Sequence, residues 1–347
     1  MLVESPPEQR AETAPAPPKR RAIRAVGLPV SAAVLVLITL ASIAIGAKDL
    51  SLAQVWHGLF HDSGTYGDVV VGERLSRTVL GLLAGAALGL SGAVLQALTR
   101  NPLADPGLLG INAGASAAVV TAITFFGVTS LTGYVWFAFA GAAGVGALVW
   151  FLGGSRGATP VRLVLAGTAI SAALFGYLQA VMIMDDAALG RMRFWTVGSL
   201  SSATNDTIQE VLPFFVAGTV LALALARPLN AMEMGDDTAR ALGANLNRTR
   251  ALAMLAATVL CGAATAACGP IVFVGLMVPH IVRSFTGPDL RWILPYAAIL
   301  SPVLLLGADV LGRIVARPAE LQVGIVTAVL GGPVFIHLVR RRRTAQL

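Results

Sequence analysis

Long stretches without any charged residue decide what this chain can fold into. Residues 111–152 contain no Asp, Glu, Lys or Arg, and residues 251–282 are charge-free over 32 positions. A helix that spans a bilayer needs about 20 apolar residues, so each stretch is long enough for two spans. Only 12% of the residues are charged, against about 25% in soluble domains. The sequence therefore predicts an integral membrane protein and excludes soluble enzymes and nucleic-acid-binding modules, so no nucleic acid partner is expected.

Ten apolar segments follow one another along the chain. The two longest charge-free stretches divide at Gly127–Gly133 and at Gly269-Pro270, where glycine and proline favour turns. The segments are residues 28–46, 78–98, 111–126, 134–152, 163–184, 208–226, 251–268, 271–282, 292–308 and 323–339. We therefore expect an all-α, polytopic membrane protein of about ten transmembrane helices over residues 25–343. Residues 1–24 are rich in Pro and Arg and predict a disordered cytoplasmic tail.

The basic residues orient these spans. With ten spans both termini lie on one side of the membrane, and that side receives 18 of the 25 Lys and Arg residues. Loops on the cytoplasmic side are enriched in Lys and Arg. The net charge of +7 therefore reflects the orientation of the spans in the membrane. We expect a multi-pass protein of the cell membrane, surrounded by membrane lipid, with both termini in the cytoplasm.

Two proline residues stiffen the cytoplasmic loop that follows the second span. Pro102 and Pro106 lie in the loop of residues 100–110, together with Asn101 and Asp105. Two prolines in five residues fix a non-helical backbone immediately after a helix. This shape suits a gate at the inner mouth of a transport path and equally suits a simple helix–helix turn.

The longest internal cytoplasmic stretch is residues 227–250. Within it, Glu233–Leu242 predicts a short amphipathic helix that ends at Gly243. A surface helix that carries both signs of charge would suit docking to a soluble partner, and the alternative is a solvated connector.

Three arginines are predicted on the external side. Arg74 and Arg77 precede the second span, and Arg313 precedes the last one. Basic residues on the outer face run against the positive-inside bias, so they could attract an acidic partner or an anionic substrate. The alternative is that their side chains extend to the membrane interface.

Sequence patterns for catalysis or metal binding are missing. The chain has no G-x-x-x-x-G-K-[ST] phosphate loop and no H-E-x-x-H, and its two cysteines lie in one apolar stretch. We therefore expect no enzymatic activity, no bound metal and no cofactor in this chain. Acidic residues within the spans are nearly limited to Asp309, which argues against an ion-coupled secondary transporter. The energy for transport would then come from a partner ATPase.

Three long segments resemble the signature motifs of FecCD-type permeases. They read RLSRTVLGLLAGAALGLSGAVLQALTRNPLADPGLLG (residues 74–110), GPIVFVGLMVPHIVR (269–283) and ADVLGRIVARPAELQVGIVTAVLGGPVFIHLVRR (308–341). The motifs occur in the family's order, and the similarity extends over about residues 28–343. These proteins are the membrane subunits of ABC importers for iron–siderophore complexes, vitamin B12 and haem.

The resemblance implies the ten-span fold of these importer permeases and a pair of subunits, either two copies or this chain with a paralogue. Each subunit would rest on a cytoplasmic ABC ATPase, which binds ATP and Mg²⁺. A substrate-binding protein outside the membrane would deliver the cargo. The resemblance favours an iron(III)–siderophore complex as cargo, with cobalamin or haem as alternatives.

The resemblance also implies roles for residues of three groups. A cytoplasmic gate would contain Asn101, Pro102, Asp105 and Pro106. Coupling to the ATPase, within residues 227–250, would involve Asp237, Ala239, Leu242 and Gly243. Docking of the binding protein would involve Arg74, Arg77 and Arg313.

Overall fold

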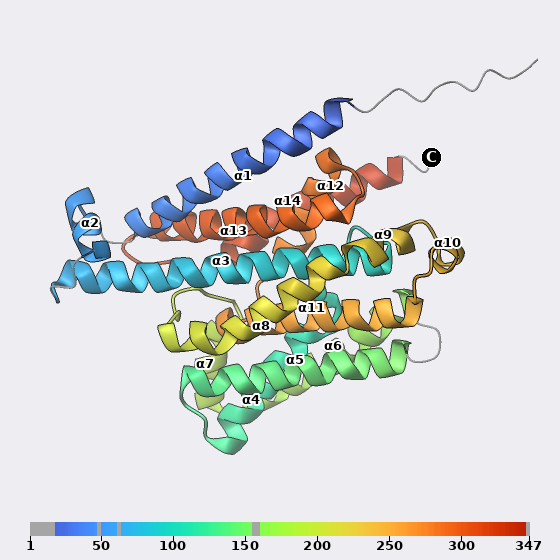
Figure 1. Ribbon diagram of the computed structural model, residues 1–347. Helices are drawn as coiled ribbons and strands as arrows, with labels where there is room; N and C mark the ends of the chain where they lie inside the picture. Colours follow the sequence, from blue (N-terminus) through green and yellow to red (C-terminus); the bar gives the residue numbers. More distant parts are fainter. Residues whose placement is uncertain (1–17, 47–49, 61–63, 155–159, 345–347) are drawn as a thin grey trace, which may run out of the picture.

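The computed structural model describes residues 18–46, 50–60, 64–154 and 160–344. Over these residues the regular secondary structure is helical, and most of the long helices run roughly side by side along one direction (Figure 1). The helices are α1 (Pro18–Ala44), α2 (Leu52–Phe60), α3 (Tyr66–Thr99), the 3-10 helix η1 (Pro106–Leu109), α4 (Ile111–Phe126), α5 (Leu131–Gly154), α6 (Pro160–Met184), α7 (Asp186–Trp195), α8 (Asn205–Ala224), α9 (Ala226–Glu233), α10 (Asp236–Ala241), α11 (Leu246–Cys268), α12 (Val274–Thr286), α13 (Leu290–Val315) and α14 (Val323–Thr344).

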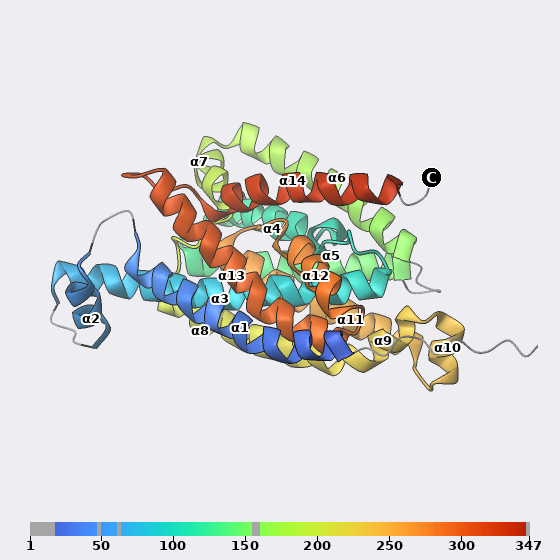
Figure 2. The same cartoon turned by 90° about the horizontal axis from the view of Figure 1, so that it is seen from above.

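The bundle has two distinct ends. The short helices α2 and α7 lie at one end, which we name the α2 end, and α9 and α10 lie at the other, the α10 end (Figure 1). Helix α1 begins toward the α10 end and α14 finishes there, as the view from above also shows (Figure 2). The first and last long helices therefore place their outer ends on the same side of the bundle, which is the arrangement that an even number of spans requires.

Ten helices fall on the ten predicted segments. Seven of them, α1, α3, α5, α6, α8, α11 and α13, are long and apolar enough to cross a membrane by length and composition. Helix α4 and the apolar part of α14 (Val323–Ile336) are shorter, and α12 has only 13 residues. The expected breaks at Gly127–Gly133 and Gly269-Pro270 lie between α4 and α5 and between α11 and α12. The prediction of an all-α fold with about ten spans is confirmed.

Helix α3 is the central helix of the bundle. Most of its second half is buried, and it packs against α11, α12 and α13. A Cβ atom on Gly92 would overlap the backbone of Gly275 in α12, and one on Gly85 would lie 2.6 Å from the Cα of Pro302 in α13. These glycines allow the backbones to approach closely, which is how helices pack in membranes without large apolar side chains between them.

Helix α3 begins twelve residues before the predicted span. The expected segment started at Thr78, but the helix starts at Tyr66 because Thr65 and Asp68 form a capping box. The amide of Asp68 donates to Thr65 Oγ1 at 3.4 Å, and the amide of Thr65 donates to Asp68 Oδ2 at 3.1 Å. Arg74 and Arg77 therefore lie on the helix itself, about one turn apart, and not in a loop before it.

Two further expectations about local structure need correction. Residues 18–24 form the start of α1, although they were predicted as part of a disordered tail; the rest of that predicted tail lies outside the described residues. The predicted helix Glu233–Leu242 is divided, because Gly235 has a φ of +109° and separates α9 from α10. Gly243 ends α10 as predicted, with a φ of +81° and its amide donating to the carbonyl of Arg240. The short helices α2 and α7 were not predicted.

Candidate functional site

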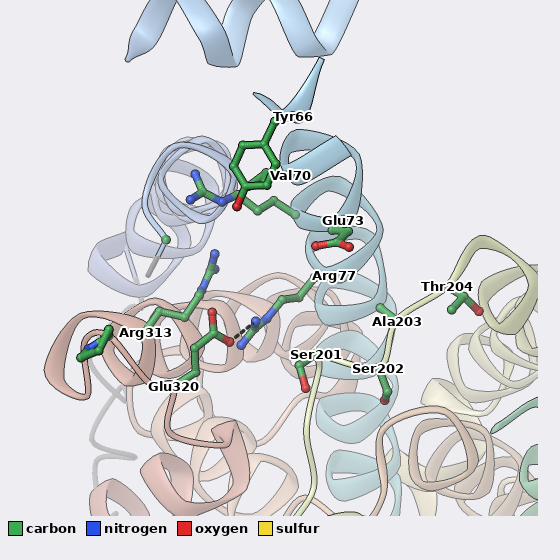
Figure 3. A pocket seen from close by; sticks show the side chains of 13 residues that line it. Tyr66, Val70, Glu73, Arg77, Ser201, Ser202, Ala203, Thr204, Arg313 and Glu320 are labelled. Carbon is green, nitrogen blue, oxygen red and sulfur yellow. Dashed lines mark hydrogen bonds and ion pairs between the residues drawn. The ribbon is translucent and has the colours of Figure 1, made fainter. Parts of the chain in front are cut away.

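The three arginines predicted on the external side come together at the α2 end. Arg74 and Arg77 belong to α3 and Arg313 to α13, and all three line one cavity of about 600 Å³. Figure 3 shows Glu320 from the loop after α13 lying against Arg77 in this cavity. The remaining walls carry hydroxyl and carboxyl groups, and the polar residues that line them are Tyr66, Glu73, Ser201, Ser202 and Thr204. We name this group of residues the arginine cavity.

Asp309 of α13 forms ion pairs with two of the arginines of the cavity. Arg77 donates from Nε to both carboxylate oxygens at 3.1 Å and from Nη2 to Oδ1 at 2.6 Å. Arg313, one turn further along α13, places Nη2 2.9 Å from Asp309 Oδ2. The Asp309 side chain is 0% exposed, and a buried charge is stable only when it is paired and hydrogen-bonded. The acidic residue that ion coupling would have required is therefore the counter-ion of two arginines.

Two of the arginines also bind the end of α1. Arg313 Nη1 donates to the carbonyl oxygens of Ser42 and Ile45 at 2.9 and 2.8 Å, and Arg74 Nη1 donates to the carbonyl of Ala44 at 3.0 Å. The last carbonyls of a helix have no partner within it, and the C-terminus of a helix favours a positive charge. The arginines therefore join α1 to α3 and α13 at the α2 end.

The three external arginines do not form an exposed positive patch at this end. Arg74, Arg77 and Arg313 are buried, and the side chain of Arg313 is 1% exposed. Their guanidinium groups already have partners on α1, α13 and the loop before α14, and all of these partners except Asp309 of Arg313 are remote in sequence. Glu320 is an accessible charged group of the cavity: its side chain is 35% exposed and its Oε2 accepts from Arg77 Nη1 at 2.6 Å. A docking role for the three arginines stays a prediction.

The loop predicted as a gate lies at the opposite end of α3. Arg100 ends the helix in the left-handed conformation with a φ of +50°, and the side-chain oxygen of Asn101 accepts from the amide two residues further on at 3.0 Å. Asp105 Oδ1 accepts from the amide of Gly107 at 2.8 Å and so caps η1, with Pro106 at the first position of that helix. The loop is thus the expected stiff turn, with one turn of 3-10 helix that was not predicted.

Asp236 connects the coupling segment to this loop. Its carboxylate forms an ion pair with Arg100 at the end of α3, and its Oδ2 accepts from Arg250 Nη2 of α11 at 2.6 Å. Burial raises the pKa of Asp236, but the hydrogen bonds from the two arginines outweigh that effect and hold the pKa below its usual value. The carboxylate therefore stays ionised at neutral pH and holds α10 against α3 and α11.

The residues predicted to couple to an ATPase divide between two faces of α10. The side chain of Asp237 is 99% exposed and pairs with Arg240, and Leu242 is 63% exposed at the end of the helix. Ala239 is fully buried and packs inward. An exposed Leu beside charged groups at the tip of a short helix is a surface that a soluble partner can contact, whereas Ala239 fixes how the helix lies on the bundle.

The sequence matches the FecCD transport family over residues 34–341, which is nearly the whole chain. The chain belongs to this family. It is 46% identical over 326 residues to the ferric enterobactin transport system permease protein FepD of Escherichia coli (strain K12), covering 92% of this chain and 96% of that protein. It is 40% identical over 303 residues to the Fe(3+)-citrate import system permease protein YfmD of Bacillus subtilis (strain 168), covering 87% and 90%.

A haem permease and a solved structure are also similar to the chain. The hemin transport system permease protein HmuU of Yersinia pestis is 38% identical over 315 residues, covering 89% of this chain and 93% of that protein. A solved structure described as an inward-facing conformation of a metal-chelate type ABC transporter has a TM-score of 0.79 and 28% identity, covering 92% of this chain and 99% of that one. The fold of this FecCD-family chain is therefore shared with a solved transporter over nearly its full length.

Two residues of this FecCD-family chain were missed by the sequence reasoning. Glu320 lies within the third quoted motif, and Asp236 directly precedes the predicted coupling residues, but neither stood out by spacing or composition. Their partners are Arg77, 243 positions away, and Arg100, 136 positions away. The segments that contain the predicted gate and coupling residues meet through the second of these pairs, while the arginine cavity lies at the other end of the bundle.

Proposed function

We propose that this chain is the transmembrane permease subunit of an ATP-driven importer for iron(III)–siderophore complexes. The family match over residues 34–341 carries the proposal, supported by relatives that are named as permeases for ferric enterobactin and ferric citrate. Haem is the second candidate cargo, because a hemin permease is 38% identical over most of the chain. Cobalamin, the third cargo expected from the sequence, has no relative of that name among those described above.

We place the α10 end in the cytoplasm and the α2 end outside. The α10 end carries the basic residues of the loops after α3, α8 and α12, and cytoplasmic loops are enriched in such residues. In this orientation the arginine cavity receives a cargo-loaded binding protein, and α10 contacts an ATPase that binds ATP and Mg²⁺. This chain itself catalyses no reaction. A second permease subunit, identical or paralogous, completes the transport path.

Coupling then proceeds through the contacts of α10. ATP binding favours one state of the ATPase pair. Because that state binds one conformation of the permease more tightly than the other, it shifts the permease toward that conformation. Movement of α10 reaches the end of α3 through the ion pair between Asp236 and Arg100, and the loop of residues 101–106 continues directly from Arg100. This contact supports a role of the loop as the inner gate, because it links the loop to the part of the chain that an ATPase would move.

Iron-limited growth tests the proposed cargo. A deletion strain is expected to lose growth on at least one ferric siderophore and to regain it when this chain is supplied on a plasmid. The iron sources are ferric enterobactin, ferric citrate and haem, with ferrous iron as the control that every strain can use. Cobalamin carries no iron, so its uptake is measured separately with labelled cobalamin. Loss of cobalamin uptake alone would show that the iron assignment is wrong while leaving the family assignment in place.

A further inference from the structure

We propose that Glu320 occupies the position beside Arg77 that a carboxylate of the binding protein takes on docking. Glu320 pairs with Arg77 in the free permease and is displaced when that protein docks. This inference rests on the proposed function, in which the α2 end receives the binding protein. The inference goes further in one respect: a residue of this chain, in the loop between α13 and α14, competes with the binding protein for Arg77.

The hydrogen bonds of Arg77 identify Glu320 as the exchangeable partner. Nε and Nη2 are used by Asp309, and Nη1 donates to Glu320 at 2.6 Å. The Asp309 side chain is 0% exposed, whereas that of Glu320 is 35% exposed. An incoming carboxylate can therefore reach the position of Glu320 but cannot reach that of Asp309.

The surroundings of Glu320 allow it to move. It belongs to the seven-residue connection between Val315, where α13 ends, and Val323, where α14 begins, so its displacement breaks no helix. Figure 3 shows its carboxylate against the Arg77 guanidinium, with Ser201 and Ser202 on the other side of Arg77. The cavity volume of about 600 Å³ is large enough to admit an acidic side chain of a partner beside the serine hydroxyls.

The exchange preserves charge balance around Arg77. Asp309 is shared between Arg77 and Arg313, so removal of Glu320 without a replacement would leave Arg77 Nη1 without a carboxylate and would oppose docking. Replacement of one carboxylate by another leaves Arg77 paired before, during and after docking. The remaining competition lowers the affinity and favours release of the binding protein after it has delivered its cargo.

The experiment uses the complete permease–ATPase complex in lipid nanodiscs. Its probe is the cargo-loaded binding protein from the same genome that stimulates ATP hydrolysis by the complex. Glu320→Gln keeps the size of the side chain, and its amide oxygen can still accept from Arg77, so the loop is retained while the competing charge is lost. We expect Kd to fall about three- to fivefold, which corresponds to a partly exposed ion pair. Glu320→Ala is the second variant and is expected to change Kd in the same direction.

Glu73→Gln is the matched control. Glu73 lines the same cavity and has no ion-pair partner in the part of the chain that the structure describes. Its replacement removes the same charge from the same cavity, so it changes the general electrostatic field but not the pairing of Arg77. We expect its effect on Kd to stay below about twofold and to disappear at high salt, because exposed charges are screened.

Two outcomes separate this inference from the proposed function. Arg77→Lys keeps the charge beside Asp309 but lacks the forked guanidinium that recognises two carboxylates, so docking is expected to weaken. If Arg77→Lys weakens docking and Glu320→Gln does not tighten it beyond Glu73→Gln, the exchange is wrong and the docking site stands. If Arg77→Lys binds like the unaltered complex, the docking role of the arginine cavity itself is wrong.

Discussion

Asp309→Asn is expected to lower the free energy of unfolding by about 3–5 kcal/mol, the cost of leaving a buried charge without its partner. The Asn side chain keeps the shape of Asp309 but cannot neutralise Arg77 and Arg313, and the Asp309 carboxylate contacts both. Since Arg313 also holds the end of α1, the loss is expected to loosen α1 from α13. The measurement is thermal unfolding of the purified protein in detergent, together with its abundance in the membrane.

Two further variants serve as controls for that result. Asp206→Asn removes an exposed carboxylate in the first turn of α8 and is expected to change stability by no more than about 0.5 kcal/mol. Asp309→Glu keeps the charge and is expected to recover part of the lost stability. If Asp309→Asn unfolded at the same temperature as the unaltered protein, Asp309 would not be the counter-ion that stabilises the buried arginines.

Asp236→Asn is expected to reduce cargo uptake by roughly tenfold, within the range of typical coupling free energies, at unchanged membrane abundance. The variant removes the carboxylate charge that holds Arg100 and Arg250 to α10. The exposed face of α10, with Asp237 and Leu242, is left intact, so the ATPase is expected to co-purify as before. The measurement is the number of ATP molecules hydrolysed per cargo molecule transported, which a purely structural role would leave unchanged.

Glu233→Gln provides the control for loss of an ion pair at the same end. Glu233 pairs with Arg283 at 2.8 Å and joins α9 to α12, and this ion pair includes no residue of α10 or of the loop after α3. The Glu233→Gln variant is expected to have the coupling ratio of the unaltered protein, that is, the same number of ATP molecules hydrolysed per cargo molecule transported. Asp236→Glu is expected to restore part of the uptake. An unchanged coupling ratio in Asp236→Asn would contradict the proposed route from α10 to the gate loop.

The spans were predictable from the sequence because membrane insertion depends on local composition. Charge-free stretches located the ten segments, and glycine or proline marked the breaks between α4 and α5 and between α11 and α12. The start of α3 was missed because hydropathy does not register a capping box, although Thr65 and Asp68 have the required spacing. The division between α9 and α10 was missed because helical periodicity does not reveal the positive φ of Gly235.

The candidate site was predicted only in part, because its geometry depends on long-range contacts. The three arginines were identified and do lie together, but their burial follows from the Asp309 pairing and from the carbonyls at the end of α1. Arg77 and Asp309 are 232 positions apart, and no local pattern indicates that they meet. For the same reason Glu320 and Asp236 became visible only when the helices were placed side by side.

Transport by the reconstituted complex tests the central claim most directly. Liposomes that contain this chain, its second permease subunit and the ATPase receive the binding protein loaded with radioactive iron in a siderophore complex. We expect iron to accumulate only when ATP is enclosed with the ATPase, and to do so equally when ionophores have collapsed every ion gradient. Accumulation without ATP, driven by an imposed ion gradient, would instead identify an ion-coupled secondary transporter and contradict the account.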